Sequence, residues 1–203
     1  LTPPPPKTRG SHSDTPLSAP EQRSIDVGAL SADNDVADVR GEQRLHTVIG
    51  DVETESTGGD VAAESVSGDV EVSGNRIEGE TYASTVSGDV TLFRMAGKVS
   101  TESVSGDIVI YEGSFSRVDL RAENGELNFN AELRKEGRLT AETDNGDVDI
   151  ELKGDVSARI DVSTFNGRIR NCFGPEAKRT SKYAPGWNLS FTEGEGDGRI
   201  DIS

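Results

Sequence analysis

Acidic side chains recur at a regular spacing along this chain, and carboxylates in such a series can bind cations or accept backbone hydrogen bonds. In seven copies of one turn, at intervals of 18 to 21 residues, an ionisable residue follows a glycine. The series is Asp51, Asp69, Asp89, Asp107, Glu126, Asp147 and Arg168. If successive copies stack, these side chains lie about 5 Å apart. Like charges at that distance repel by roughly 1 kcal/mol in water, so another interaction must compensate.

Two interpretations of the acidic series remain open. Calcium could bind between successive carboxylates, because it prefers six to eight oxygen ligands. The candidates for such a site are Asp51, Asp69, Asp89, Asp107 and Asp147. Alternatively, each aspartate accepts a backbone N–H within its own turn. The sequence favours the second interpretation, since the G-G-x-G-x-D repeat of calcium-binding β-rolls is absent. We therefore predict no cofactor other than this calcium candidate.

A second charged series lies halfway between the copies of the first and changes sign along the chain. It consists of Glu42, Asp60, Glu80, Lys98, Arg117, Arg138 and Arg159. The basic members Arg117, Arg138 and Arg159 are candidates for docking an acidic protein, an anionic glycan or a neighbouring copy. The alternative, which the sequence favours, is that these arginines pair with acidic residues on adjacent coils, where exposed pairs contribute little.

Most of the few aromatic residues are expected to pack in the core, and three of them could instead bind a sugar or a partner. Four phenylalanines are predicted to fill the wider coils, namely Phe93, Phe115, Phe129 and Phe165. Tyr82 and Tyr111 could stack on sugars if they are exposed. Trp187 is predicted to cover the apolar end of the last coils, with partner binding as the alternative.

Catalytic motifs are missing from the sequence. His46 has no cysteine or histidine at metal-ligand spacing, and Cys172, the only cysteine, is predicted to be a buried small residue. No G-x-S-x-G turn and no glycine-rich phosphate loop occur. The sequence therefore predicts a protein that is not an enzyme.

Net charge limits the partners. The chain of 203 residues carries a formal charge of −16, which opposes binding to nucleic acid. No run of 18 apolar residues is present, so we expect membrane contact only through an N-terminal anchor or signal that has been removed. An envelope protein or a glycan is the expected partner.

The elements that must position these residues are short strands. Side chains alternate with a period of two, with Val66, Val70 and Val72 assigned to one apolar face. The phrase Val-Ser-Gly-Asp occurs at 66–69, 86–89 and 104–107, and sandwich loops would have no reason to repeat in this way. Stacked coils would repeat the phrase, because each corner lies directly on the previous one. We predict an all-β fold, a single-chain parallel β-solenoid (β-helix) of about eight or nine coils. Each coil has roughly 20 residues and two strands.

Proline marks the boundaries of this domain. Six of the eight prolines fall in the first twenty residues, so residues 1–23 are predicted to be a disordered proline-rich linker. Residues 24–203 form the predicted solenoid domain. An irregular loop at 174–186 is expected before a C-terminal cap.

The repeated SGDV phrase, the Tyr-Ala-Pro-Gly-Trp-Asn-Leu segment at 183–189 and the closing Gly-Asp-Gly-Arg-Ile-Asp-Ile at 196–202 together resemble the bacterial toastrack domain. This family of β-strand-repeat envelope proteins is also described as adhesin-like. The resemblance covers residues 24–203 and implies a non-enzymatic domain outside the cytoplasm, associated with membrane-stress signalling or surface attachment. It carries over no catalytic or binding residue.

Three functions follow from these observations. The leading hypothesis is a non-catalytic, extracytoplasmic scaffold or interaction domain, periplasmic or otherwise outside the cytoplasm and tethered to the membrane through the linker. A carbohydrate-binding or carbohydrate-active β-helix is the first alternative. A self-assembling solenoid filament is the second.

Overall fold

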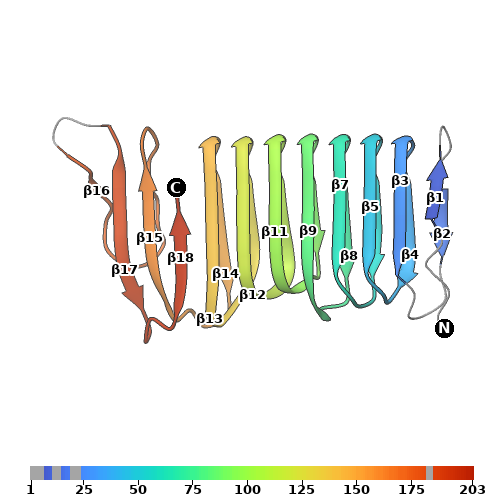
Figure 1. The fold of residues 1–203 in the computed structure, drawn as a ribbon. Helices are drawn as coiled ribbons and strands as arrows, with labels where there is room; N and C mark the ends of the chain where they lie inside the picture. Colours follow the sequence, from blue (N-terminus) through green and yellow to red (C-terminus); the bar gives the residue numbers. More distant parts are fainter. Residues whose placement is uncertain (1–6, 11–14, 19–23, 182–184) are drawn as a thin grey trace.

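The computed structural model describes residues 7–10, 15–18, 24–181 and 185–203. Every regular element in these residues is a β-strand, and the chain winds into a flattened solenoid of two sheets (Figure 1). Strands of successive coils pair in parallel, with matching positions aligned from coil to coil. The predicted all-β parallel solenoid is therefore confirmed.

Each coil contributes one strand to each sheet. The first sheet contains β3 (Ile25–Ser31), β5 (Gln43–Ile49), β7 (Val61–Ser67), β9 (Glu78–Ser87) and β11 (Ala96–Ser105), then the second halves of β12 (Ile108–Asn124) and β13 (Leu127–Asn145). The second sheet contains β4 (Asn34–Val39), β6 (Val52–Ser56), β8 (Val70–Gly74), β10 (Val90–Phe93), the first halves of β12 and β13, and β14 (Val148–Lys153). These strands form seven coils in the described residues. The prediction of eight or nine was too high because the chain leaves the pattern after β14.

Inward side chains of the two sheets meet in a narrow apolar core. One column runs through Val52, Val70, Val90, Ile108 and Leu127, all fully buried. Valine gives way to larger residues toward the C-terminus, where the rings of Phe115 and Phe129 pack with their centroids 5.9 Å apart. Phe165 is 79% exposed, so the prediction that it fills a coil was wrong.

Glycine is required at the corners where the chain passes from the first sheet to the second. Gly106 has a φ of +150°, and a Cβ atom added there would lie 1.8 Å from the carbonyl oxygen of Gly88 in the preceding coil. No side chain can occupy that space, because real Cβ contacts are about 3 Å or longer. Stacking of the corners therefore explains why the glycine recurs in every copy of the phrase.

Hydroxyl side chains occupy the inner position just before most corners, with Ala122 as an exception. Ser65 Oγ donates to the carbonyl of Gly50 at 3.0 Å, and Thr85 Oγ1 donates to that of Gly68 at the same distance. Val66 therefore points outward and is 39% exposed. The sequence prediction had placed Val66 on the same apolar face as Val70, which was wrong. The corner glycine changes the direction of the chain, so the alternation does not continue across it.

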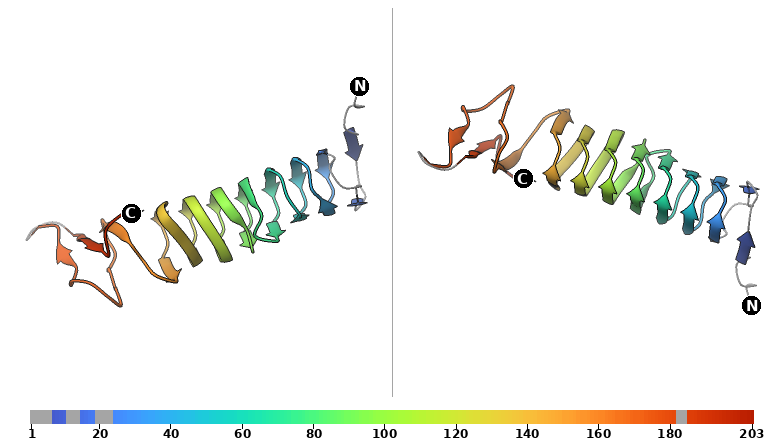
Figure 2. Two further views of the ribbon diagram at one scale, coloured as in Figure 1. Left: turned by 90° about the horizontal axis from the view of Figure 1, so that it is seen from below. Right: turned by 90° about the horizontal axis from the view of Figure 1, so that it is seen from above.

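The C-terminal strands extend the first sheet alone. After β14 the chain crosses to β15 (Ala158–Thr164) and leaves one strand position empty beside β13. The last strand, β18 (Gly198–Ile202), fills this position and pairs in parallel with both β13 and β15. Beyond β15 lies β17 (Trp187–Glu193), which is antiparallel and also contacts the two-residue β16 (Lys178–Arg179). Figure 2 shows these strands at the opposite end of the elongated molecule from the N-terminal segment.

The predicted linker, residues 1–23, lies largely outside the described residues. Within it, β1 (Lys7–Gly10) and β2 (Thr15–Ser18) pair in parallel with β3 and β4. The predicted loop at 174–186 contains only β16 as a strand in its described part, and residues 182–184 lie outside the described residues. The described residues contain no helix long and apolar enough to cross a membrane.

Candidate functional site

Four arginines line up on the outer surface of the first sheet. Parallel register places Arg117 beside Arg138, Arg138 beside Arg199, and Arg199 beside Arg159. Adjacent strands of a sheet lie about 4.8 Å apart, so the four side chains form a continuous positive row across β12, β13, β18 and β15. We call Arg117, Arg138, Arg199 and Arg159 the arginine row.

The row is assembled from three separate parts of the chain. Arg117 and Arg138 belong to regular coils, whereas Arg159 comes from the strand that follows the crossing. Arg199, which sequence reasoning missed, enters through β18 and separates Arg138 from Arg159. Arg199 lies 40 residues after Arg159, which is two intervals of the repeat, so the spacing alone would place it two coils beyond Arg159 rather than between Arg138 and Arg159.

The opposite end of the same line of side chains is acidic. Register carries the line from Arg117 to Lys98 and then to Glu80, with Asp60 and Glu42 on the next coils. The Lys98 ammonium lies 3.9 Å from the Glu80 carboxylate, where the sign changes. This line of side chains on the first sheet therefore carries opposite charges at its two ends.

Three members of the arginine row have a carboxylate two residues later on the same strand. Arg117 Nε donates to Asp119 at 2.6 Å, and Arg199 donates to both oxygens of Asp201 at 2.6 and 2.9 Å. The sequence had favoured pairing with acidic residues on adjacent coils. That arrangement occurs in Arg121, which donates to Glu142 at 2.6 Å, but it is not how these members of the row are paired.

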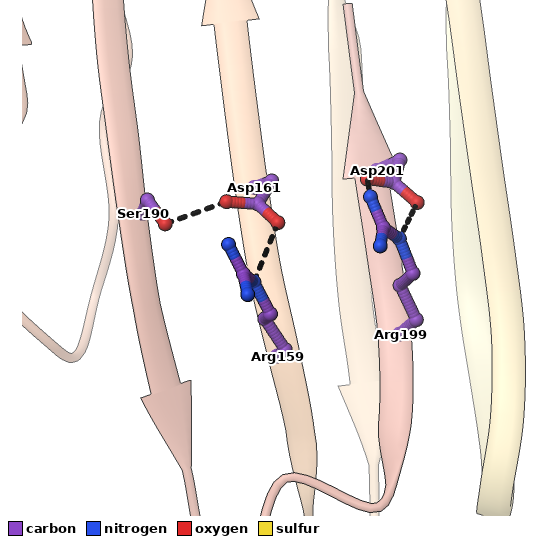
Figure 3. Close-up of polar contacts among 5 residues, drawn as sticks. All are labelled: Arg159, Asp161, Ser190, Arg199 and Asp201. Carbon is purple, nitrogen blue, oxygen red and sulfur yellow. Dashed lines mark hydrogen bonds and ion pairs between the residues drawn. The ribbon is translucent and has the colours of Figure 1, made fainter.

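Asp161 is the most enclosed carboxylate of the site. Ser190 on β17 donates its hydroxyl to Asp161 at 2.5 Å, and Arg159 Nε donates to the other carboxylate oxygen at 3.0 Å (Figure 3). The Ser190 hydrogen bond is the largest cause of the lowered pKa of Asp161. The charges of Arg159 and Arg199 also lower this pKa, whereas partial burial raises it. The matching contact with Asp201 raises the pKa of Arg199. Both shifts favour the ionised forms of Asp161 and Arg199.

Arg138 differs from the other three. Thr140 occupies the position on β13 that Asp119 and Asp201 occupy on the neighbouring strands. Arg138 is exposed and has no ion pair or side-chain hydrogen bond within the described part of the chain. The centre of the row therefore carries a positive charge that no described side chain pairs with.

The acidic series is a hydrogen-bonded ladder. In each step the aspartate Oδ1 accepts the backbone N–H of the acidic residue one coil further on, at 2.8 to 2.9 Å. The acceptors are Asp33, Asp51, Asp69, Asp89 and Asp107. The sequence had placed the accepted N–H within the same corner, and the stack corrects this to the next corner. Each bond to an ionised acceptor offsets the repulsion between neighbouring carboxylates.

The ladder leaves few oxygens for a metal ion. One oxygen of each accepting aspartate is already bonded, and Glu126 replaces aspartate before Asp147, so no ladder bond reaches Asp147. Among the residues that the structure describes, no cluster of three or more histidine, cysteine, aspartate or glutamate side chains converges in a way that could hold a metal ion. The calcium interpretation of Asp51, Asp69, Asp89, Asp107 and Asp147 thus gains no support from their geometry.

Comparison with known proteins identifies the family. A model described as Toastrack DUF4097, a domain of unknown function, matches residues 10–100 and again residues 94–203. The chain belongs to the toastrack family. No curated protein and no solved structure matches this toastrack chain. The resemblance noted in the sequence is therefore confirmed at the level of family and fold.

The aromatic candidates of the toastrack chain are not brought together. Tyr82 points outward from β9 on the first sheet, beside Ser100 of β11. Tyr111 lies on the second sheet and stacks on Phe93 with a centroid distance of 4.6 Å. Trp187 is half-buried on β17, with the Arg179 guanidinium 5.4 Å from its ring. No common sugar-binding surface includes all three.

Two further residues with reactive side chains stand apart from the arginine row. His46 lies 3.6 Å from Glu64 on the acidic half of the first sheet. Cys172 is exposed in the segment between β15 and β16, so the prediction that it is buried was wrong. Among the residues that the structure describes, no hydroxyl or thiol is hydrogen-bonded to His46, and Cys172 has no side-chain hydrogen bond or ion pair, so neither forms a nucleophile–base pair.

Proposed function

We propose that this toastrack chain is a non-catalytic interaction scaffold that works outside the cytoplasm, and that its arginine row docks an acidic surface of an envelope protein. The observation that carries the proposal is the unneutralised centre of the row at Arg138. A solenoid built only for stability gains little from four aligned guanidinium groups, because exposed ion pairs contribute little. On a chain of net charge −16, the row brings four guanidinium groups side by side, three of them paired with aspartates and Arg138 without such a partner in the described residues.

Charge complementarity supports a protein with clustered carboxylates as the partner. Such a partner would meet Arg138 directly and could exchange with the internal partners of Arg117 and Arg199. A regular sheet offers a rigid, flat surface, so little ordering entropy is lost on docking. The binding should weaken steeply with salt, since every contact is exposed.

The location outside the cytoplasm rests on the family resemblance and on the four consecutive prolines at residues 3–6, a sequence suited to a stiff tether. A partner in the cell envelope would connect the scaffold to membrane-stress signalling. An anionic glycan on the row would instead give the adhesin-like function.

The test is crosslinking of the full chain in cells, followed by envelope fractionation and identification of what co-purifies. Arg138→Glu removes the unpaired charge and is expected to abolish recovery of the partner. Arg44→Glu is the matched control, because Arg44 is an exposed arginine on the same sheet but at the acidic end. Equal loss with both variants, or with neither, would count against the arginine row. Recovery of glycan alone would favour the adhesin-like function.

A further inference from the structure

The two sheets of the solenoid end at different places. Beyond the seventh coil, the first sheet continues through β18, β15 and β17. The second sheet ends with β14, whose only strand partner in the described residues is β13. The outer edge of β14 is thus the end of a parallel sheet without a following strand.

Backbone groups on this edge point toward the absent strand. In every earlier coil, the first inward residue of the second-sheet strand donates its N–H to a carbonyl of the next coil, at 2.8 to 2.9 Å. The donors are Asn34, Val52, Val70, Val90, Ile108 and Leu127. Val148 is next in this series and finds no acceptor in the described part of the chain. Because strand residues alternate, Ile150 and Leu152 present their N–H and C=O groups on the same side.

The side chains on this edge are also incompletely covered. Leu127 and Phe129 in the preceding coil are at most 1% exposed, whereas Val148, Ile150 and Leu152 are only half-buried. A hollow of about 480 Å³ borders the end of the strand at Leu152 and Lys153, and Val156 and Ala158 line its other side. One more strand would cover this apolar edge and satisfy its hydrogen-bonding groups.

Charge defines the strand that fits. Asp149 and Glu151 are exposed on the outer side of β14 and would lie directly beside the outward residues of an added strand. Glu151 also accepts from Lys153 at 2.7 Å and from Asn130 at 2.5 Å, whereas Asp149 has no side-chain partner among the described residues. Opposite charges at such cross-strand positions are favourable and like charges are not. Basic residues are therefore favoured at the outward positions beside Asp149 and Glu151, with apolar residues between them.

We infer that β14 is a docking edge for an extended, basic segment of a partner protein, in which apolar and basic residues alternate. The segment adds to the second sheet by backbone hydrogen bonding. A second copy of the chain fits less well. Antiparallel pairing of two β14 strands about Ile150 would place Asp149 opposite Glu151, and each copy carries a charge of −16. This edge lies on a different sheet from the arginine row and selects the opposite charge.

The experiment uses the full chain and a heptapeptide of alternating lysine and valine as the probe. We expect amide hydrogen exchange at Val148, Ile150 and Leu152 to slow about tenfold at saturating peptide. A heptapeptide of alternating glutamate and valine is the control and should leave exchange unchanged. Equal protection by both peptides, or protection confined to other strands, would overturn the inference.

A pair of double variants tests the charge requirement without altering the core. Asp149→Lys with Glu151→Lys should weaken binding of the lysine–valine peptide at least about tenfold. Glu53→Lys with Glu71→Lys makes the same change of charge on exposed positions in the middle of the second sheet, and should leave the affinity within about twofold. Similar losses in both would show a non-specific charge effect and refute the docking edge. Arg138→Glu should not affect this binding, so failure here is separate from failure of the proposed function.

Discussion

Replacement of Gly106 by alanine should destabilise the solenoid far more than an ordinary glycine-to-alanine change. The added Cβ would lie 1.8 Å from the Gly88 carbonyl oxygen, so the backbone of two coils must separate by more than 1 Å to restore a normal contact. An alanine held at a φ of +150° adds strain of about 1–3 kcal/mol.

Separation of the coils also weakens the hydrogen bonds of the corner. The Asp107 N–H donates to Asp89 at 2.8 Å, and the Gly88 N–H donates to the Ser105 carbonyl at 3.0 Å. Loss of these two bonds costs about 2 kcal/mol in total. The combined loss for Gly106→Ala is therefore about 3–5 kcal/mol, a large fraction of the stability of a typical domain.

Gly28→Ala is the matched control, because Gly28 lies in a strand with nothing within 4 Å of the added Cβ. That change should alter the free energy of unfolding by less than about 1 kcal/mol. Urea unfolding followed by far-ultraviolet circular dichroism measures both variants, with hydrogen exchange to detect local unfolding of the corner. If Gly106→Ala came within about 1 kcal/mol of Gly28→Ala, the corners could not be stacked as closely as described.

Three other predictions address the ladder, the core and the enclosed carboxylate. Asp89→Ala removes the acceptor for the Asp107 N–H and should cost about 1–2 kcal/mol in urea unfolding, whereas Asp89→Asn keeps an acceptor and should cost less. Equal costs would show that charge, not the hydrogen bond, matters. Phe129→Ala should cost about 3–5 kcal/mol, because the ring is 1% exposed; a loss below about 1 kcal/mol would contradict this packing. The folded-state pKa of Asp161 is lowered, so its contribution to stability is complete above the unfolded value of about 3.9 and is lost as the pH falls through the lower folded value. The stability difference between wild type and Asp161→Asn should therefore shrink in acid, and a difference that stayed constant from neutral pH to about pH 2 would refute the assigned shift.

The regular coils could be predicted from the sequence because the spacing of the repeat determines which residues pair between successive coils. The intervals of the two charged series change together, and this places Arg117 beside Arg138 without knowledge of the structure. The same spacing could not place Arg199, because β18 fills a position that the chain had skipped 40 residues earlier. A repeat in the sequence predicts that strands stack in chain order, so it cannot predict a strand that inserts between two earlier ones.

Residues at the corners show a second limit of sequence analysis. The alternation of Val66 and Val70 suggested one continuous apolar face, but the corner glycine reverses the outcome for Val66. Ser65 is buried instead because its hydroxyl satisfies a corner carbonyl of the preceding coil. The aspartate ladder likewise crosses between coils. A purely local turn would have Asp69 accept an N–H of its own corner, whereas it accepts the Asp89 N–H of the next coil.

Docking of an acidic partner on the arginine row is tested most directly by site-specific photocrosslinking in cells. A photoreactive residue at Thr140 would lie on β13 two residues after Arg138, and one at Ser84 would lie on the same sheet near its acidic half. Both positions are half-buried and polar, so neither replacement should disturb the core. We expect a single protein, rich in acidic residues, to crosslink at Thr140 and not at Ser84, and to be lost with Arg138→Glu. Equal crosslinking at the two positions, or none at Thr140 while the chain is folded and in the envelope, would contradict the proposed docking function.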